Sequence, residues 1–178
     1  MELLENEWLR DYEMTRRMEP VIRKDMLKLC GCQGLTLQCL DTSVKSPASF
    51  IEKCQRKFTS GAVPEISDAV RFTVLCKRDP LHTAQEMAEG LTGAGYLVCE
   101  LDDKFSHPNS CGYVGVHLHV ITHGGGRFEV QVHTPESLKA REQSHPIYER
   151  ERSMTTGRKE RAQCIRRMKS IYQTVPRP

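Results

Sequence analysis

Residues 114–133 read Val-Gly-Val-His-Leu-His-Val-Ile-Thr-His-Gly-Gly-Gly-Arg-Phe-Glu-Val-Gln-Val-His. The stretches 114–121 and 127–133 combine β-branched residues with an alternation of side chains that has the period of a β-strand. Between them, residues 122–126 contain three consecutive glycines, which is typical of a hairpin turn. The sequence therefore predicts two neighbouring strands joined by a tight turn.

Further strands and helices are predicted on both sides of this hairpin. Apolar, β-rich stretches predict strands at 35–40, 69–76 (a central strand) and 96–101. Apolar residues at helical spacing predict helices at 1–30, 47–58, 81–91, 135–150 and 162–172. We expect Pro20 to kink or split the first helix, and Gly31 and Gly34 to end it. This order predicts an α/β (α+β) fold, a mixed β-sheet flanked by helices.

The length of 178 residues suits one domain. We expect an N-terminal helical segment (1–34), a catalytic core (35–150) and a basic C-terminal helix (151–178). With 38% hydrophobic and 28% charged residues, the chain has enough apolar material for a core, which excludes disorder as its main state. No apolar run approaches the roughly 20 residues of a membrane span, so no membrane partner is expected.

Charge is unevenly distributed along the chain. The net charge is +3, yet residues 139–178 hold 11 basic and 4 acidic residues, a net +7. This tail either favours an anionic partner or is a solvated basic helix. The eight cysteines accompany no secretory signal, so we expect reduced thiols that pack as small hydrophobes.

Two clusters of charged and polar residues precede the hairpin. Lys45, Ser49 and Lys53 are spaced i, i+4, i+8 near a predicted helix start, where ammonium groups and backbone N–H groups bind phosphate. Asp68 and Arg71 flank the start of an apolar strand, where a carboxylate can hold Mg²⁺ and an arginine can neutralise phosphate oxygens. The alternatives are a solvated helix face and a surface salt bridge.

The hairpin strands supply a second pair of clusters. Glu129, Gln131 and His133 share one sheet face, which predicts an open polar face where Glu129 can accept a proton or share a metal. Tyr113 follows a glycine loop, where its ring can stack on a nucleobase, and His117 lies four residues beyond it. The alternatives are a solvated sheet face, a zinc site built from His117 and His119, or histidines satisfied by hydrogen bonds. Together, a metal-type carboxylate, a candidate base and several cations point to phosphoryl-group chemistry.

Four segments, taken in order, resemble the synthetase domain of RelA/SpoT homologues. Residues 45–53 resemble the family's basic ATP-binding segment, and Asp68-Ala-Val-Arg71 its metal-binding Asp followed by Arg. Residues 111–117 resemble the acceptor loop N-G-Y-x-x-x-H, and residues 128–134 the strand E-x-Q-[IV]-x-T. The following helix is echoed by Glu142, His145 and Tyr148. The likeness spans about 42–150 and implies a synthetase fold related to nucleotidyltransferases.

The resemblance implies an ATP-dependent pyrophosphokinase. In such a reaction the 3′-hydroxyl of an acceptor nucleotide attacks the β-phosphorus of ATP, pyrophosphate is transferred and AMP leaves. The implied catalytic residues are Glu129 (general base), Asp68 and Gln131, with Asp68 and Glu129 as Mg²⁺ ligands. The implied ATP or phosphate ligands are Lys45, Ser49, Lys53 and Arg71. The implied acceptor ligands are Tyr113, His117 and His133.

The chain also departs from the family pattern. Ser43 replaces an Arg, the Asp–Arg spacing is shortened and lacks a Gly, Cys111 replaces an Asn, and His133 stands where Arg is frequent. The shortened spacing, with the run His-Thr-Pro-Glu-Ser, resembles the toxin branch of the family. Such a likeness implies adenosine nucleotides as favoured acceptors, giving (p)ppApp, with guanosine nucleotides, giving (p)ppGpp, next.

A toxin of this kind implies ATP depletion and a protein inhibitor, either an immunity protein or an antitoxin. It would act in the bacterial cytoplasm and could be delivered there as a secreted effector domain. Two alternatives stay open. One is pyrophosphorylation of tRNA 3′ ends, which the basic tail supports. The other is a catalytically inactive module that binds RNA or a partner.

Overall fold

The computed structural model describes residues 2–58, 66–77, 79–153 and 155–177. The helices are α1 (Glu2–Gln33), α2 (Pro47–Lys57), α3 (Pro80–Gly93), α4 (Pro135–Arg152) and α5 (Arg158–Tyr172), with a 3₁₀ turn at Leu40–Thr42. The strands are β1 (Thr36–Gln38), β2 (Val70–Leu75), β3 (Leu97–Asp103), β4 (Val116–Ile121) and β5 (Arg127–His133). The predicted order of elements is confirmed, and β5 has the predicted bounds.

The five strands form one mixed sheet in the order β1-β2-β5-β4-β3. β2 and β5 run parallel, and the other neighbouring pairs run antiparallel. The predicted mixed sheet is therefore confirmed, and β2 is an interior strand. In the β4–β5 pair, His117 lies opposite Gln131 and His119 opposite Glu129. Because β2 also pairs with β5, Arg71 is the cross-strand neighbour of Glu129 on the other side.

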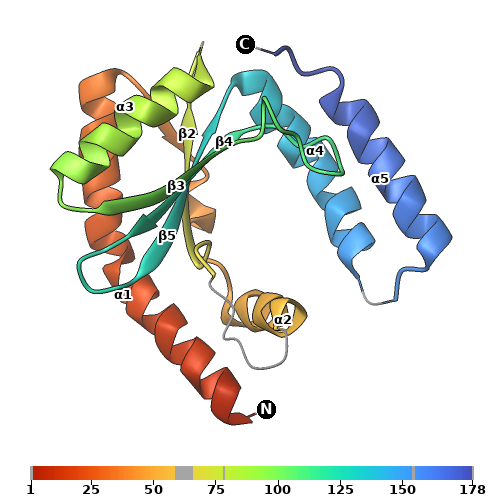
Figure 1. Cartoon of the computed structure of the whole chain (residues 1–178), viewed down its shortest axis with the longest axis horizontal. Helices are drawn as coiled ribbons and strands as arrows, with labels where there is room; N and C mark the ends of the chain where they lie inside the picture. The colour runs from red at the N-terminus through yellow and green to blue at the C-terminus, as the bar shows by residue number, and fades with distance from the viewer. Residues whose placement is uncertain (1, 59–65, 78, 154, 178) are drawn as a thin grey trace.

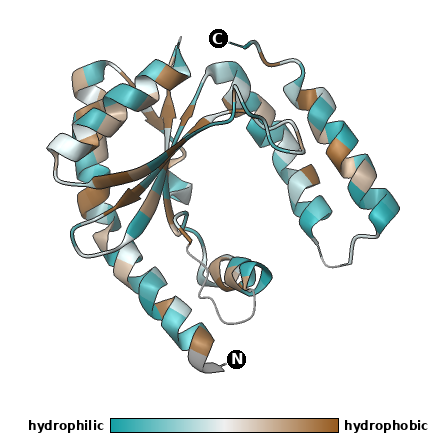
Figure 2. Cartoon of the chain, in the orientation of Figure 1, coloured by the Kyte–Doolittle hydropathy of each residue, from teal (hydrophilic) through white to brown (hydrophobic). Residues whose placement is uncertain are grey.

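The sheet has one apolar face and one polar face. Alternate residues of β2, β4 and β5, such as Phe72, Leu118 and Val130, are fully buried in the main core. They pack against the apolar stripes of α1 and α3, which contribute Met26 and Met87. Figure 1 shows α1 and α3 on one side of the sheet, and Figure 2 shows the brown strands beside them. The opposite face of the same strands carries their polar side chains.

The helical hairpin of α4 and α5 lies on the other side of the sheet, and α2 lies below it in the same view (Figure 1). A small cluster of Cys111, Cys164 and Met168 packs between this hairpin and the loop before β4. None of the helices in the described part of the chain is long and apolar enough to cross a membrane.

α1 differs from its predicted form. It is not split at Pro20, and it continues through Gly31 to Gln33. Pro20 is exposed, while Ile22 and Met26, which continue the apolar stripe beyond it, are fully buried. Tertiary packing on one side therefore outweighs the local cost of a proline. Gly34, with φ +66°, ends the helix, as the left-handed conformation favours glycine.

The start of α2 follows the sequence closely. Ser46 is the N-cap, and its hydroxyl accepts a hydrogen bond from the Ser49 backbone N–H at 3.3 Å. Pro47 occupies the first turn, where its missing N–H is not needed. Just upstream, Lys45 N–H donates to the Ala69 carbonyl at 2.9 Å. This bond holds the entry to α2 against the start of β2.

Candidate active site

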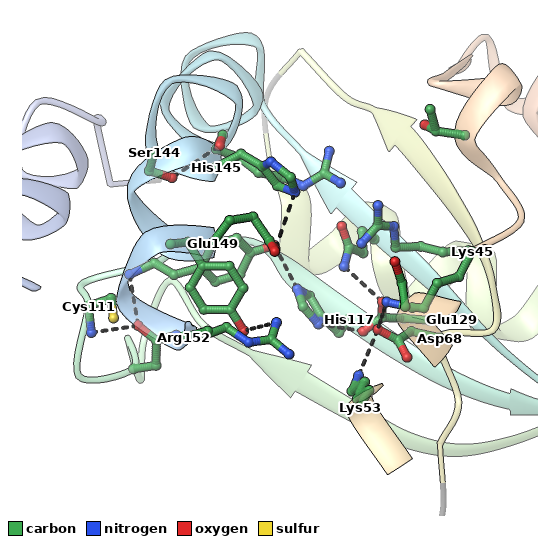
Figure 3. Close-up of a pocket in the computed structure, with 18 of the residues that line it drawn as sticks. Lys45, Lys53, Asp68, Cys111, His117, Glu129, Ser144, His145, Glu149 and Arg152 are labelled. Atoms are coloured by element: carbon green, nitrogen blue, oxygen red, sulfur yellow. Dashed lines mark hydrogen bonds and ion pairs between the residues drawn. The ribbon is translucent and has the colours of Figure 1, made fainter. Parts of the chain in front are cut away.

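A pocket of about 620 Å³ opens on the polar face of the sheet, between α2 and the α4–α5 hairpin. Figure 3 shows side chains from these elements converging on it. The predicted site residues that line it are Lys45, Ser49, Lys53, Asp68, Arg71, Tyr113, His117, Glu129 and Gln131. His133, the remaining predicted site residue, is fully buried and is not among the lining residues.

Asp68 lies two residues before β2, between two lysines (Figure 3). Its Oδ2 atom pairs with Lys45 Nζ at 3.1 Å and with Lys53 Nζ at 2.7 Å. Burial by itself raises the pKa of Asp68, but the Lys53 and Lys45 charges outweigh burial and lower it. The carboxylate is therefore ionised at neutral pH. Lys45 precedes α2 and does not belong to its face, contrary to the predicted helical spacing.

Glu129 lies on β5 at the floor of the pocket and is only 6% exposed. Its Oε1 atom pairs with His117 Nδ1 at 2.9 Å, and its Oε2 atom accepts a hydrogen bond from Gln131 Nε2 at 2.8 Å. Burial by itself raises the pKa of Glu129, but His117, through its charge and hydrogen bond, and Arg71 hold it well below its ordinary value. The side chain is thus an oriented, ionised carboxylate, and the contacts that hold its pKa low also weaken it as a proton acceptor.

The predicted open polar face is in fact covered. Glu129, Gln131 and His133 share a face, as predicted, but each is buried. Side chains of the neighbouring strand β4, such as His117, and of the loop before β4 and helices α2, α4 and α5 cover them and form the pocket walls. The prediction of a shared polar face is confirmed, and the prediction of an open one is wrong.

The donor set of the pocket fits one hard cation. Asp68 Oδ1 is buried and has no hydrogen-bond partner among the residues that the structure describes. An ionised oxygen without a donor is an available ligand for Mg²⁺, which needs only one or two protein carboxylates beside water and phosphate. Glu129 is close enough for its charge to act on Asp68. A zinc site would need at least three such protein ligands. In the described segments, no group of three His, Cys, Asp or Glu residues is placed to hold a metal ion.

Arg71 lines the pocket from β2. Among the described residues, no ion pair is found for its guanidinium, while the two lysines are both occupied by Asp68. Its charge nevertheless acts on Glu129 across the parallel β2–β5 pair. Arg71 is therefore a cation available for an anionic ligand.

Tyr113 joins two histidines beside the pocket. Its hydroxyl lies 2.8 Å from His117 Nε2 and 3.1 Å from His133 Nε2. His119, two residues beyond His117, bonds instead through Nδ1 to the Ser67 hydroxyl at 2.6 Å. These contacts favour histidines satisfied by hydrogen bonds over a zinc site. His133 lies behind Tyr113, so a direct contact with an acceptor, as predicted for it, is not supported by its position.

The residues of α4 that line the pocket are not among the predicted site residues. Arg141, His145, Tyr148 and Arg152 all line the pocket. The Arg152 guanidinium lies 4.6 Å from the centre of the Tyr148 ring and donates to its hydroxyl at 2.8 Å. The signal was their spacing of i, i+4, i+7, i+11, which places them on one helix face. For His145 and Tyr148 the sequence indicated only that their helix resembles the one that follows the E-x-Q-[IV]-x-T strand in the family.

The chain is similar to a known protein family over most of its length. A family model described as a region found in RelA/SpoT proteins matches residues 42–153, more than half of the chain. No curated protein sequence matches the chain.

Solved structures with the same fold cover nearly the whole chain. The Type VI effector Tas1, crystallised with its immunity protein, is 19% identical, with a TM-score of 0.61 over 93% of this chain and 94% of that one. Small alarmone synthetase 1 from Bacillus subtilis, bound to its product pppGpp, is 17% identical, with a TM-score of 0.65 over 94% and 92%. Identities this low show the fold alone, which is the predicted synthetase fold. By its family match, the chain belongs to the RelA/SpoT family and is a nucleotide pyrophosphokinase.

Proposed function

We propose that the protein transfers the β,γ-pyrophosphate of ATP to the 3′-hydroxyl of a purine nucleotide. One observation carries this proposal. A single pocket brings together the ionised Glu129, a second carboxylate with an unpartnered oxygen, Asp68, and three cations from separate segments. In-line transfer between two nucleotides needs a proton acceptor, charge neutralisation and a shared cavity, and each is available here.

Glu129 is the proposed general base. The acceptor 3′-hydroxyl gives its proton to the Glu129 carboxylate as its oxygen bonds to the β-phosphorus. The bond between the β-phosphorus and the α–β bridging oxygen breaks, and AMP leaves with that electron pair. His117 and Gln131 hold one carboxylate oxygen each, so they orient the base. Gln131 therefore acts through Glu129 in this scheme.

Lys45, Lys53 and Arg71 are proposed to bind the ATP phosphates, with Ser49 beside them at the start of α2. Asp68, together with Glu129, would hold Mg²⁺, which supplies positive charge to the phosphate oxygens when bound. The lysines reach phosphate by leaving Asp68, and Asp68 is thereby freed for the metal. In the structure these residues form a closed set of ion pairs, and in this scheme ATP would open it.

The acceptor is proposed to lie between Tyr113 and α4. Its base would stack on Tyr113, and His117 would contact its ribose or phosphate. Adenosine nucleotides, giving (p)ppApp, are the favoured acceptors, with guanosine nucleotides next. The likeness to Tas1, an effector with an immunity protein, supports a toxin that depletes ATP in the bacterial cytoplasm after delivery and has a protein inhibitor of its own.

The test is an incubation of the purified protein with Mg²⁺, ATP and one of AMP, ADP, GMP, GDP, GTP or tRNA, resolved by anion-exchange chromatography. ATP serves as its own acceptor in a further reaction. We expect AMP release together with a more highly charged nucleotide, and no turnover by Glu129→Gln. The matched control is Glu100→Gln, an exposed residue on β3. Turnover by Glu129→Gln would show that the base is wrongly assigned.

The tRNA reaction is a second candidate because of α5. This helix presents exposed cations with one acid, Glu160, which already pairs with Arg150 at 2.7 Å. The exposed basic residues of the helix are Arg158, Lys159, Arg166, Arg167 and Lys169. A polyanion is attracted to such a surface. Label transferred from γ-³²P-ATP to tRNA would support this candidate, and label found only on nucleotides would exclude it.

A further inference from the structure

His133 is a buried polar side chain that the proposed reaction does not use. It is fully buried and bonds on both ring nitrogens, to Tyr113 on one side and to Ser137 at 2.9 Å on the other. We propose that His133 and Ser137 are positioning residues, which hold the Tyr113 ring in place on the acceptor wall of the pocket. This proposal rests on the proposed function, because Tyr113 is the residue on which the acceptor base would stack.

Counting donors and acceptors fixes how the three side chains bond. The Ser137 hydroxyl donates its proton to the Thr134 carbonyl at 3.1 Å. Ser137 Oγ must therefore accept from His133 Nδ1–H, which leaves His133 Nε2 without a proton. That nitrogen accepts the Tyr113 hydroxyl proton when His117 Nε2, 2.8 Å from the same oxygen, donates to it. The result is a one-way chain of donors from Tyr113 through His133 and Ser137 to the backbone.

The neutral state of His133 agrees with this chain. Burial, followed by the positive charges of Arg141 and His117, lowers the pKa of His133 well below its ordinary value. A neutral imidazole has one donor and one acceptor, as the chain requires. An arginine at this position would have no acceptor and could not bind the Tyr113 proton.

Contacts between aromatic rings also hold this arrangement in place. The His133 and Tyr113 rings meet edge to face, with centroids 5.9 Å apart, and the Tyr172 ring meets Tyr113 in the same way at 5.6 Å. Gly115 lies against both groups. A Cβ at Gly115 would lie 2.8 Å from His133 Cε1 and 3.0 Å from the Tyr113 hydroxyl oxygen. A side chain at position 115 would therefore have to displace His133 or the Tyr113 hydroxyl.

Because His133 does not reach the pocket, its effect must pass through Tyr113. The other side of the Tyr113 hydroxyl faces His117 Nε2, and His117 Nδ1 pairs with Glu129. A displaced Tyr113 ring should therefore weaken acceptor binding while the ATP side, built from α2 and β2, stays intact. A purely structural role for His133 predicts losses on both sides.

The test is steady-state kinetics of His133→Phe, which keeps a ring of similar size. The acceptor is the nucleotide that proves productive in the chromatography assay. We expect the acceptor KM to rise about tenfold, as for a lost buried hydrogen bond, and the ATP KM to stay within about twofold. In the Tyr113→Phe background, His133→Phe should change the acceptor KM little, because the bond is already absent. Ser137→Ala should resemble His133→Phe, and Ser137→Thr should restore the acceptor KM.

Equal rises in both KM values, or additive effects in the double variant, would overturn the proposal. A second measurement does not depend on turnover. In ligand-free protein labelled with 3-fluorotyrosine, the ¹⁹F resonance of Tyr113, assigned by Tyr113→Phe, should shift in Ser137→Ala while that of the distant Tyr12 does not. An unchanged Tyr113 resonance also overturns the proposal. A wild-type protein without turnover would refute the proposed function, and the ¹⁹F result would still decide the positioning role.

Discussion

Replacing His117 with alanine is expected to destabilise the protein by about 3 kcal/mol at pH 7, because it removes the hydrogen-bond partner of one oxygen of a buried, ionised carboxylate. Glu129 is 6% exposed, and His117 Nδ1 at 2.9 Å is the partner of one of its two carboxylate oxygens. The alanine variant leaves that oxygen without this donor, while Gln131 still serves the other. Arg71, the cross-strand neighbour, still supplies some compensating charge, so we place the cost no higher than this.

The assay is equilibrium unfolding in urea, followed by far-ultraviolet circular dichroism, for wild type, His117→Ala, Glu129→Gln and the double variant. In the Glu129→Gln background no charge is stranded, so removing His117 should cost only about 1 kcal/mol, as for a neutral hydrogen bond. The coupling energy between the two residues is then about 2 kcal/mol. A coupling energy below about 0.5 kcal/mol would refute the reasoning.

The same pair predicts a pH dependence. The pKa of Glu129 is lower in the folded state than its ordinary value of 4.5, so the unfolded state binds its proton first as the pH falls. The stabilisation is therefore complete above pH 4.5 and is lost as the pH falls below it, towards the folded-state pKa. We expect the free energy of unfolding of wild type to fall more steeply below pH 4.5 than that of Glu129→Gln. Parallel curves would contradict this assignment.

Three further predictions concern packing, capping and thiol reactivity. Phe72→Ala should cost about 3–5 kcal/mol in urea unfolding, since Phe72 is fully buried, whereas Leu97→Ala, at a side chain 61% exposed, should leave the midpoint nearly unchanged. Ser46→Ala should cost about 1 kcal/mol by removing the α2 N-cap, and an unchanged thermal midpoint would argue against it. Burial raises the pKa of Cys54 to about 11, so at pH 8 Ellman's reagent should modify the exposed Cys32 rapidly and Cys54 only after unfolding.

The parts of the fold set by local chemistry could be predicted from the sequence. β5 has its predicted bounds, because alternation in 127–133 places valines in the core and polar groups opposite. The Ser46 cap and Pro47 start of α2 are likewise local signals. The expectation that Pro20 would split the first helix was wrong. A buried apolar stripe continues α1 beyond the proline, and this packing cannot be inferred from the proline itself.

The site was predictable where residues from different segments belong to an ordered motif. Lys53, Asp68 and Glu129 meet in one pocket as the motifs imply. The burial of His133 could not be predicted, because the polar face looks the same in sequence whether water or another element covers it. Arg141 was missed because α4 is polar on all sides, so its sequence does not indicate which face turns to the pocket.

The two lysines that share one oxygen of Asp68 bear on how ionic strength acts on this protein. Lys45 and Lys53 already have an anionic partner before any nucleotide arrives. A phosphate that binds them replaces a carboxylate, so the number of ion pairs changes little and few counterions are released from these two side chains. The salt dependence of ATP binding should therefore be shallower than the number of cations in the pocket suggests. In the proposed reaction, most of the electrostatic gain would then come from Arg71 and from the Mg²⁺ proposed for Asp68.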